Sequence, residues 1–170
     1  AKDFGISEEV GQAKQYLNTI WCGGRPASTK GFVSNVEQLD AKFAVCIAKF
    51  AKQYKARDGS LCISSAYRST EHQRAICGST GSTGCAAPGK SNHQRGIAVD
   101  FHARNYQDMH SAVRSFPGGG LRHLTIANDP YHVEATSNGI CGTGVAAQNT
   151  GPAPTQNPFM TPLQQLFAPT

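Results

Sequence analysis

Apolar residues recur at helical spacing in two segments near the start of the chain. Residues 7–20 begin with a serine cap and two acidic residues, and four apolar residues then share one helical face. Residues 34–54 repeat apolar positions at steps of three and four, with lysines on the opposite side. The apolar positions are Val10, Ala13, Leu17 and Ile20 in the first segment, and Val36, Leu39, Phe43, Ile47, Phe50 and Tyr54 in the second. The pattern predicts one helix in each segment.

Shorter elements follow in the second half of the chain. Period-two alternation and turn residues predict strands, and a capping-box-like Ser69-Thr70 predicts the start of a short helix. The predicted strands are 61–67, 97–102, 121–127 and 131–135, and the predicted helices are 69–77 and 105–116. Together these elements predict an α+β fold, in which a small antiparallel sheet is covered by the N-terminal helices.

The chain changes character after Cys141. Residues 142–170 are rich in proline, glycine and threonine, and they lack periodicity until the apolar segment FMTPLQQLF at 159–167. We expect one domain over residues 1–141 and a tail over 142–170. The apolar segment has two interpretations: it folds back over an apolar patch, or it docks the protein to a larger assembly.

Charge and cysteine content narrow the class of protein. The net charge is +5, and the basic residues are scattered, which does not predict a nucleic-acid-binding stripe. No apolar stretch reaches the roughly 20 residues of a membrane span. Six cysteines without a CxxC pair favour disulfides in an oxidising compartment, so we expect a protein that works outside the cytosol. The loop GSTGSTG lies between Cys77 and Cys85, and we predict that these two cysteines are linked.

A carboxylate in an apolar strand points to a site. Asp100 lies between Val99 and Phe101, and a buried carboxylate without a partner is costly. Alternation places Asp100 on one face of its strand and His132 on one face of another, so pairing of the two strands brings these side chains together. His93 precedes the first strand and can close over them.

Two imidazoles and one carboxylate are a suitable ligand set for a catalytic zinc ion. Asp129, in the turn before His132, can reach water as a general base without being a ligand. Arg68 can bind a substrate carboxylate or stabilise an oxyanion, and Glu134 can orient a ligand imidazole from behind. Taken alone, each of these residues has a more common structural role. A strand aspartate, for example, usually pairs with an arginine. His102 shares the face of Asp100 and is a weaker candidate, whereas no partner is evident for His72, His110 or His123.

The order of these residues resembles a known group of metallopeptidases. The pattern SxHxxGxAxD, followed by a carboxylate three residues before a histidine, occurs at Ser91–Asp100 and Asp129–His132. Upstream, Ser65–Gln73 is similar to a second segment of that group, S-x-Y-R-S-x-x-x-Q. The group contains lysostaphin-type and VanY-like D-Ala-D-Ala peptidases, phage L-alanyl-D-glutamate endopeptidases and the hedgehog signalling domain. The resemblance covers roughly residues 60–135.

The resemblance implies a zinc peptidase that cleaves the stem peptides of peptidoglycan. It also implies a periplasmic or extracellular protein, or one associated with a phage virion, and the larger assembly to which the tail docks would then be an envelope or phage assembly. The implied zinc ligands are His93, Asp100 and His132, the implied general base is Asp129, Arg68 contacts the substrate, and Ser91 helps to hold it. The carboxypeptidase branch usually has Glu-x-Trp-His where this chain has Asp-Pro-Tyr-His. Endopeptidase activity, such as L-Ala-D-Glu cleavage, is therefore favoured over D-Ala-D-Ala carboxypeptidase activity. The alternative is a non-catalytic zinc-containing module that binds cell wall or protein.

Overall fold

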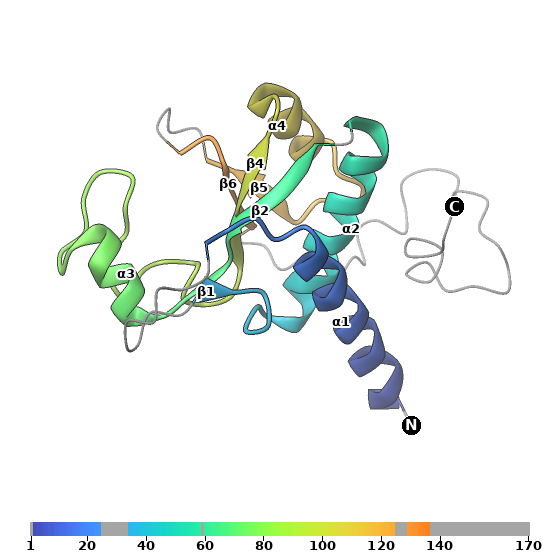
Figure 1. The fold of residues 1–170 in the computed structure, drawn as a ribbon, viewed down its shortest axis with the longest axis horizontal. Helices are drawn as coiled ribbons and strands as arrows, with labels where there is room; N and C mark the ends of the chain where they lie inside the picture. The colour runs from blue at the N-terminus through green and yellow to red at the C-terminus, as the bar shows by residue number, and fades with distance from the viewer. Residues whose placement is uncertain (1, 25–33, 59, 125–128, 137–170) are drawn as a thin grey trace, which may run out of the picture.

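The computed structural model describes residues 2–24, 34–58, 60–124 and 129–136 (Figure 1). Its helices and strands in chain order are α1 (Lys2–Thr19), β1 (Ser34–Asn35), α2 (Ala41–Asp58), β2 (Leu61–Ser65), β3 (Tyr67–Arg68), α3 (Thr70–Cys77), β4 (Ala98–Ala103), α4 (Tyr106–Arg114), β5 (Leu121–His123) and β6 (His132–Ala135). Four strands form one antiparallel sheet in the order β2-β4-β6-β5, and β1 pairs with β3. The predicted α+β class is confirmed.

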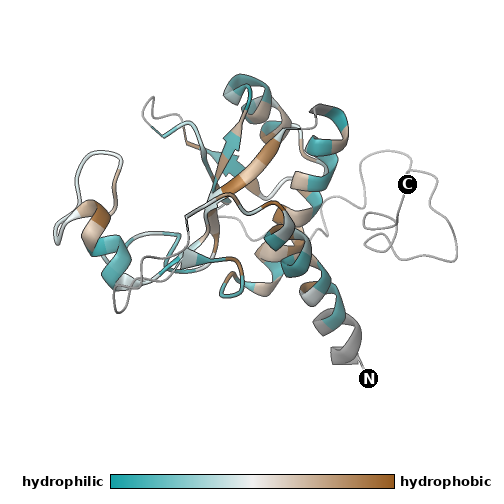
Figure 2. Ribbon diagram, in the orientation of Figure 1, coloured by the Kyte–Doolittle hydropathy of each residue, from teal (hydrophilic) through white to brown (hydrophobic). Residues whose placement is uncertain are grey.

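The sheet has one helix-covered face and one polar face. Val99 and Phe101 of β4 are fully buried, and the Phe101 ring packs on Phe50 of α2 at a centroid distance of 5.9 Å. α1 packs along α2, and α3 lies well apart from both helices (Figure 1). Figure 2 shows a brown, apolar stretch along β2 in the middle of the view. Because alternate residues of a strand face opposite sides, Ala98 and Asp100 point away from this core.

Both N-terminal helices begin at other residues than predicted. α1 starts at Lys2 rather than Ser7, since a good capping residue permits a helix start without forcing one. α2 starts at Ala41 rather than Ser34, because the Asp40 carboxylate accepts a hydrogen bond from Phe43 N at 3.0 Å. Before that cap, Asn35 Oδ1 accepts from Gln38 N at 3.0 Å and forms a turn, which competes with helix formation.

The shorter elements agree more closely with their predictions. Ser69 and Asn105 cap α3 and α4, where their side chains accept from His72 N and Asp108 N. The predicted strand 61–67 is divided into β2 and β3, and the strand predicted at 121–127 is shorter because β5 ends at His123. Residues 125–128 and the tail at 142–170 lie outside the described residues. No helix in the described ranges is long and apolar enough to cross a membrane.

Two disulfides between described residues tie irregular segments to the sheet and to α3. Cys22–Cys62 links the chain after α1 to β2, and Cys77–Cys85 closes the loop after α3, with Cα atoms 5.4 Å apart. The predicted Cys77–Cys85 pair is thus confirmed. No described cysteine is a free thiol.

Replacing Cys77 and Cys85 together by serine is expected to lower stability. Opening a loop of this length restores chain entropy worth about 2–3 kcal/mol to the unfolded state. In thermal unfolding without reductant, the double variant should melt about 5 °C or more below the native protein. Ser79→Ala, in the same loop, is the control and should melt with the native protein. Equal melting of all three would show that the link contributes nothing.

Candidate active site

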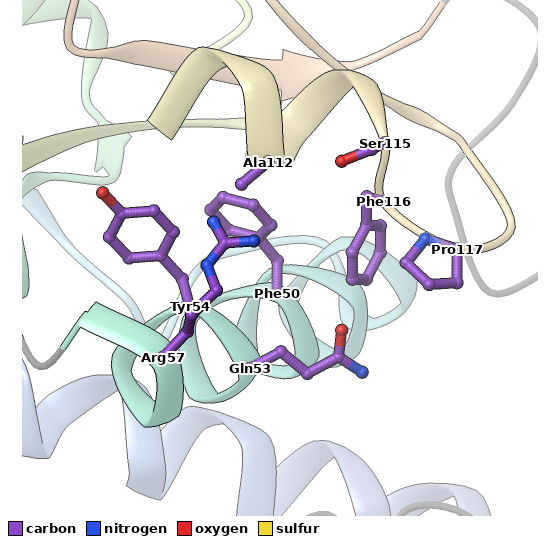
Figure 3. A pocket seen from close by; sticks show the side chains of 8 residues that line it. All are labelled: Phe50, Gln53, Tyr54, Arg57, Ala112, Ser115, Phe116 and Pro117. Carbon is purple, nitrogen blue, oxygen red and sulfur yellow. The ribbon is translucent and has the colours of Figure 1, made fainter. Parts of the chain in front are cut away.

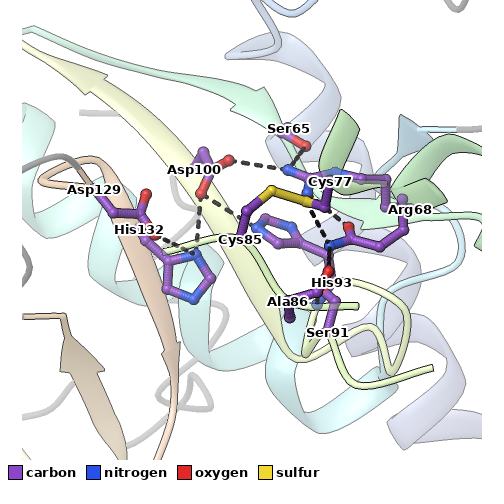
Figure 4. Close-up of a disulfide and its surroundings, with 11 residues drawn as sticks. Ser65, Arg68, Cys77, Cys85, Ala86, Ser91, His93, Asp100, Asp129 and His132 are labelled. Carbon is purple, nitrogen blue, oxygen red and sulfur yellow. Dashed lines mark hydrogen bonds and ion pairs between the residues drawn. A yellow bond between two sulfur atoms is a disulfide. The ribbon is translucent and has the colours of Figure 1, made fainter. Parts of the chain in front are cut away.

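His93, Asp100 and His132 converge on the polar face of the sheet (Figure 4). Asp100 of β4 lies directly opposite His132 of β6 in the antiparallel register. Asp100 Oδ1 is 3.2 Å from His132 Nδ1 and 3.3 Å from His93 Nε2. All three residues are buried, and one ligand atom from each lies within 4.8 Å of the others. The structure therefore brings together the three residues that the sequence predicts as ligands.

Backbone contacts of the loop before β4 fix the position of His93. Ser91 Oγ accepts from His93 N at 3.2 Å, and His93 O accepts from Arg68 N at 3.1 Å. Gly96 then reverses the chain with φ +72°, where a Cβ would lie 2.8 Å from Asp40 N. Only glycine fits such a close approach at positive φ. The serine and glycine of the motif thus have a structural use in placing the histidine.

The hydrogen-bond partners of the two imidazoles decide which nitrogen faces Asp100. His93 Nδ1 lies 2.8 Å from the Ala66 carbonyl, which only accepts, so Nδ1 carries the proton and Nε2 is left as an acceptor. His132 Nε2 lies 2.8 Å from Glu134 Oε1 and donates to it, so His132 Nδ1 is the nitrogen that faces Asp100. One nitrogen of each imidazole and a carboxylate oxygen therefore point at one another. These three atoms can share a positive charge, carried either by a proton on an imidazole or by a bound metal ion.

The pKa values of Asp100 and His132 also indicate that a positive charge lies within the cluster. Burial by itself raises the pKa of Asp100, but hydrogen bonds from His132 and His93 outweigh it and hold that pKa well below its ordinary value. Burial by itself lowers the pKa of His132, yet the hydrogen bonds with Asp100 and Glu134 raise it to about 9. The raised pKa means that His132 keeps a proton near Asp100. A metal cation can take the place of that proton.

Glu134 holds His132 from behind and is itself held by two side chains. Glu134 Oε2 accepts from Asn92 Nδ2 at 2.7 Å and from Arg122 Nη2 at 2.8 Å. Burial tends to raise the pKa of Glu134, but hydrogen bonds from His132 and Arg122 lower it to about 2. The carboxylate is thus ionised and fixed, as predicted for a group that orients a ligand. Nothing in the sequence pattern singles out Asn92 or Arg122.

Arg68 joins the cluster to α3 and to the disulfide. Its Nη2 donates to Asp100 Oδ2 at 3.2 Å and to Ser65 Oγ at 3.0 Å, and its Nη1 donates to Gln73 Oε1 at 2.9 Å. Gln73, only 1% exposed, donates in turn to Cys77 Sγ at 3.1 Å. The sequence motif contains Gln73, but its role as the link between the disulfide and Arg68 is seen only in the structure.

Asp129 lies at the edge of the cluster and lines the same cleft. Its Oδ2 is 3.9 Å from His132 Nδ1, farther than either carboxylate that contacts this imidazole directly. Burial raises the pKa of Asp129, and Coulombic attraction to His132 opposes that rise. The carboxyl is therefore placed beside the ligand atoms rather than among them, with a raised pKa that suits proton transfer.

The cleft over the cluster has a volume of about 270 Å³. Its lining includes the cluster, Asp129, Arg68, Ser91 and the exposed Tyr131. His102 is exposed and lies outside the group of ligand atoms.

A smaller hollow of about 110 Å³ lies between α2 and the end of α4 (Figure 3). Its lining consists of Phe50, Gln53, Tyr54, Arg57, Ala112, Ser115, Phe116 and Pro117. These side chains include no group of carboxylates and histidines. The larger cleft is therefore the candidate active site.

Residues 36–119 match the family model of VanY, D-alanyl-D-alanine carboxypeptidase. The match identifies the class of protein, a peptidase that acts on peptidoglycan. Within that class, the matched range is similar to the VanY-like group, as the motif resemblance predicted. The matched range contains the motif from Ser91 to Asp100 and ends before Asp129 and His132. A search of curated proteins finds no match to the chain.

Proposed function

We propose that this protein is a zinc-dependent peptidase that cleaves stem peptides of peptidoglycan, with endopeptidase activity favoured over D-Ala-D-Ala carboxypeptidase activity. One observation carries the proposal. His93 Nε2, His132 Nδ1 and Asp100 Oδ1 meet as three atoms that could hold a metal ion, while the opposite nitrogens of the two imidazoles contact the Ala66 carbonyl and Glu134.

The donor set fits zinc. Two imidazole nitrogens and one carboxylate oxygen are typical ligands of a catalytic zinc ion, which keeps a further position open. His93, Asp100 and His132 would hold the ion. When bound, it supplies a Lewis acid that polarises the scissile amide and favours ionisation of water.

The remaining residues of the cleft have roles that follow from their positions. Asp129, beside His132 and with a raised pKa, accepts the proton of the attacking water and delivers it to the leaving amine. Three contacts that the structure shows for Arg68 use three of its five N–H groups. Of the two that are left, the Nε N–H is buried without a hydrogen-bond partner among the described residues, and one N–H of Nη1 can donate to a substrate oxygen. Ser91 Oγ accepts from His93 N and keeps its own proton to donate to the substrate.

The preference for an endopeptidase rests on residues outside the family match. Asp129 and Tyr131 stand where carboxypeptidases of the group usually have glutamate and tryptophan, and the match ends at residue 119. Digestion of purified peptidoglycan, followed by mass spectrometry with and without a chelator, tests the scissile bond and the metal together. Release of internal stem fragments that stops with chelator supports the proposal. Release of D-alanine alone would make the protein a carboxypeptidase. Binding to the wall without any cleavage would favour the non-catalytic module.

Glu134→Gln is expected to weaken zinc binding by about 10–100-fold, because the neutral amide no longer orients and polarises His132. Competition with a zinc-sensitive dye measures the affinity directly. Glu71→Gln, which removes a carboxylate in α3 outside the cleft, is the control. An unchanged affinity in Glu134→Gln would remove Glu134 from the support of the site.

The setting of the enzyme is part of the proposal. Disulfides and a peptidoglycan substrate support a location outside the cytosol, on the cell envelope or on a phage particle. Docking of the segment 159–167 to a larger assembly stays a prediction of the sequence. Truncation after Gly151 tests it: unchanged melting and hydrolysis with loss of association would support docking, and a melting temperature lower by several degrees would contradict it.

A further inference from the structure

Two histidines outside the cleft form a stacked pair. His110 of α4 and His123 of β5 have parallel rings, with centroids 4.0 Å apart and planes inclined by 3°. Neither residue lines the cleft or belongs to the group of ligand atoms. Both nevertheless contact segments of backbone that form the cleft wall.

His110 contacts the turn that carries Asp129. Its Nε2 lies 2.6 Å from the carbonyl oxygen of Pro130, and because a carbonyl only accepts, Nε2 donates. Pro130 stands between Asp129 and Tyr131, which both line the cleft. The next carbonyl, that of Tyr131, accepts from Phe101 N at 2.9 Å. The turn is therefore fixed at two consecutive carbonyls, one by β4 and one by His110.

His123 holds the other side of the same wall. Arg114 Nη1 lies 2.9 Å from His123 Nε2, and since arginine only donates, this nitrogen accepts. His123 Nδ1 therefore carries the proton and donates to the carbonyl of Leu124 at 3.1 Å, and Leu124 lines the cleft. Stacking on this fixed ring limits the rotation of His110.

We propose that His110 is a positioning residue for Asp129: through the Pro130 carbonyl it holds the general base at its distance from the ligand cluster. This inference rests on the proposed function, since it assigns His110 to the same reaction. The hydrogen bond fixes the backbone beside Asp129 and makes no contact with substrate or ligands. Its loss should therefore lower kcat and leave KM and zinc content nearly unchanged.

Three variants test the proposal. His110→Phe keeps a ring that can stack on His123 and removes the donor. His110→Gln removes the ring and keeps an N–H donor near the place of Nε2. His102→Phe is the matched control, because His102 is an exposed histidine of β4 outside the cleft. Each variant is compared by kcat, KM, zinc content and hydrogen–deuterium exchange of the peptide 129–134.

His110→Phe is expected to lower kcat by about tenfold, with KM within about twofold, and to speed exchange of the 129–134 peptide. His110→Gln should restore most of kcat and exchange protection, and His102→Phe should match the native protein in both. Native kcat and native exchange in His110→Phe would overturn the proposal. Faster exchange with native kcat would reduce His110 to a structural contact. If the native protein hydrolyses nothing, the proposed function fails by itself. The role of His110 in catalysis then fails as well. Hydrogen–deuterium exchange still tests separately whether His110 holds the turn.

Discussion

His132→Ala is expected to lose most of its zinc and at least about 1000-fold of its hydrolytic activity. The substitution removes one of three ligands and leaves Asp100 and Glu134 buried without the imidazole that contacts both. Buried carboxylates that lose a hydrogen-bond partner are costly, and the zinc no longer favours the folded state, so the melting temperature should fall as well. Metal analysis of the purified variant measures the first effect, and digestion of peptidoglycan measures the second.

The control for this prediction is His102→Ala, which removes an exposed imidazole from the neighbouring strand and should keep its zinc. Stoichiometric zinc in His132→Ala would contradict the ligand assignment. Loss of zinc in both variants would show that the measurement reports general destabilisation rather than the site.

Asp129→Ala is expected to keep the zinc and lose at least about 100-fold in hydrolysis, the usual scale for a general base. Its carboxylate lies 3.9 Å from His132 Nδ1 and outside the ligand set, so its removal leaves the three ligand atoms in place. Measuring zinc content and kcat on the same sample separates the two effects.

A matched control is Asp108→Ala, which removes a half-exposed carboxylate of α4 outside the cleft. Near-native turnover in zinc-loaded Asp129→Ala would move the base to another residue, and Glu134 would be tested next. The combination of lost turnover and lost zinc would instead make Asp129 part of the metal site.

Strand geometry predicted the part of the site that lies on the paired strands. Alternation along the strands placed Asp100 and His132 on one face, and their antiparallel pairing put them opposite each other. The sequence placed His93 only at the loop before the first of these strands, because the loop from Ser91 to Gly96 is held by backbone contacts that no periodicity reveals. Asn92 and Arg122, which hold Glu134, are distant in sequence and carry no local signal.

The start of α2 shows why a regular apolar pattern misled. Val36 and Leu39 are buried, as helical spacing predicts, yet they lie before Asp40, which caps the helix. Both positions are buried whether the segment is a helix or a turn, and burial favours apolar side chains in either case. The pattern therefore predicted the core residues correctly and did not determine where the helix begins. The motif contains Gln73, but no pattern predicted its contacts or those of the two stacked histidines, because these contacts join elements that only the fold brings together.

The central claim is that one zinc ion binds three named atoms, and anomalous scattering tests it most directly. Crystals of the protein grown with zinc, measured on both sides of the zinc absorption edge, should show one strong peak bonded to His93 Nε2, Asp100 Oδ1 and His132 Nδ1. The bond lengths should be about 2.0–2.2 Å. Absence of a peak in the cleft at stoichiometric zinc, or a peak bonded to other residues, would contradict the account.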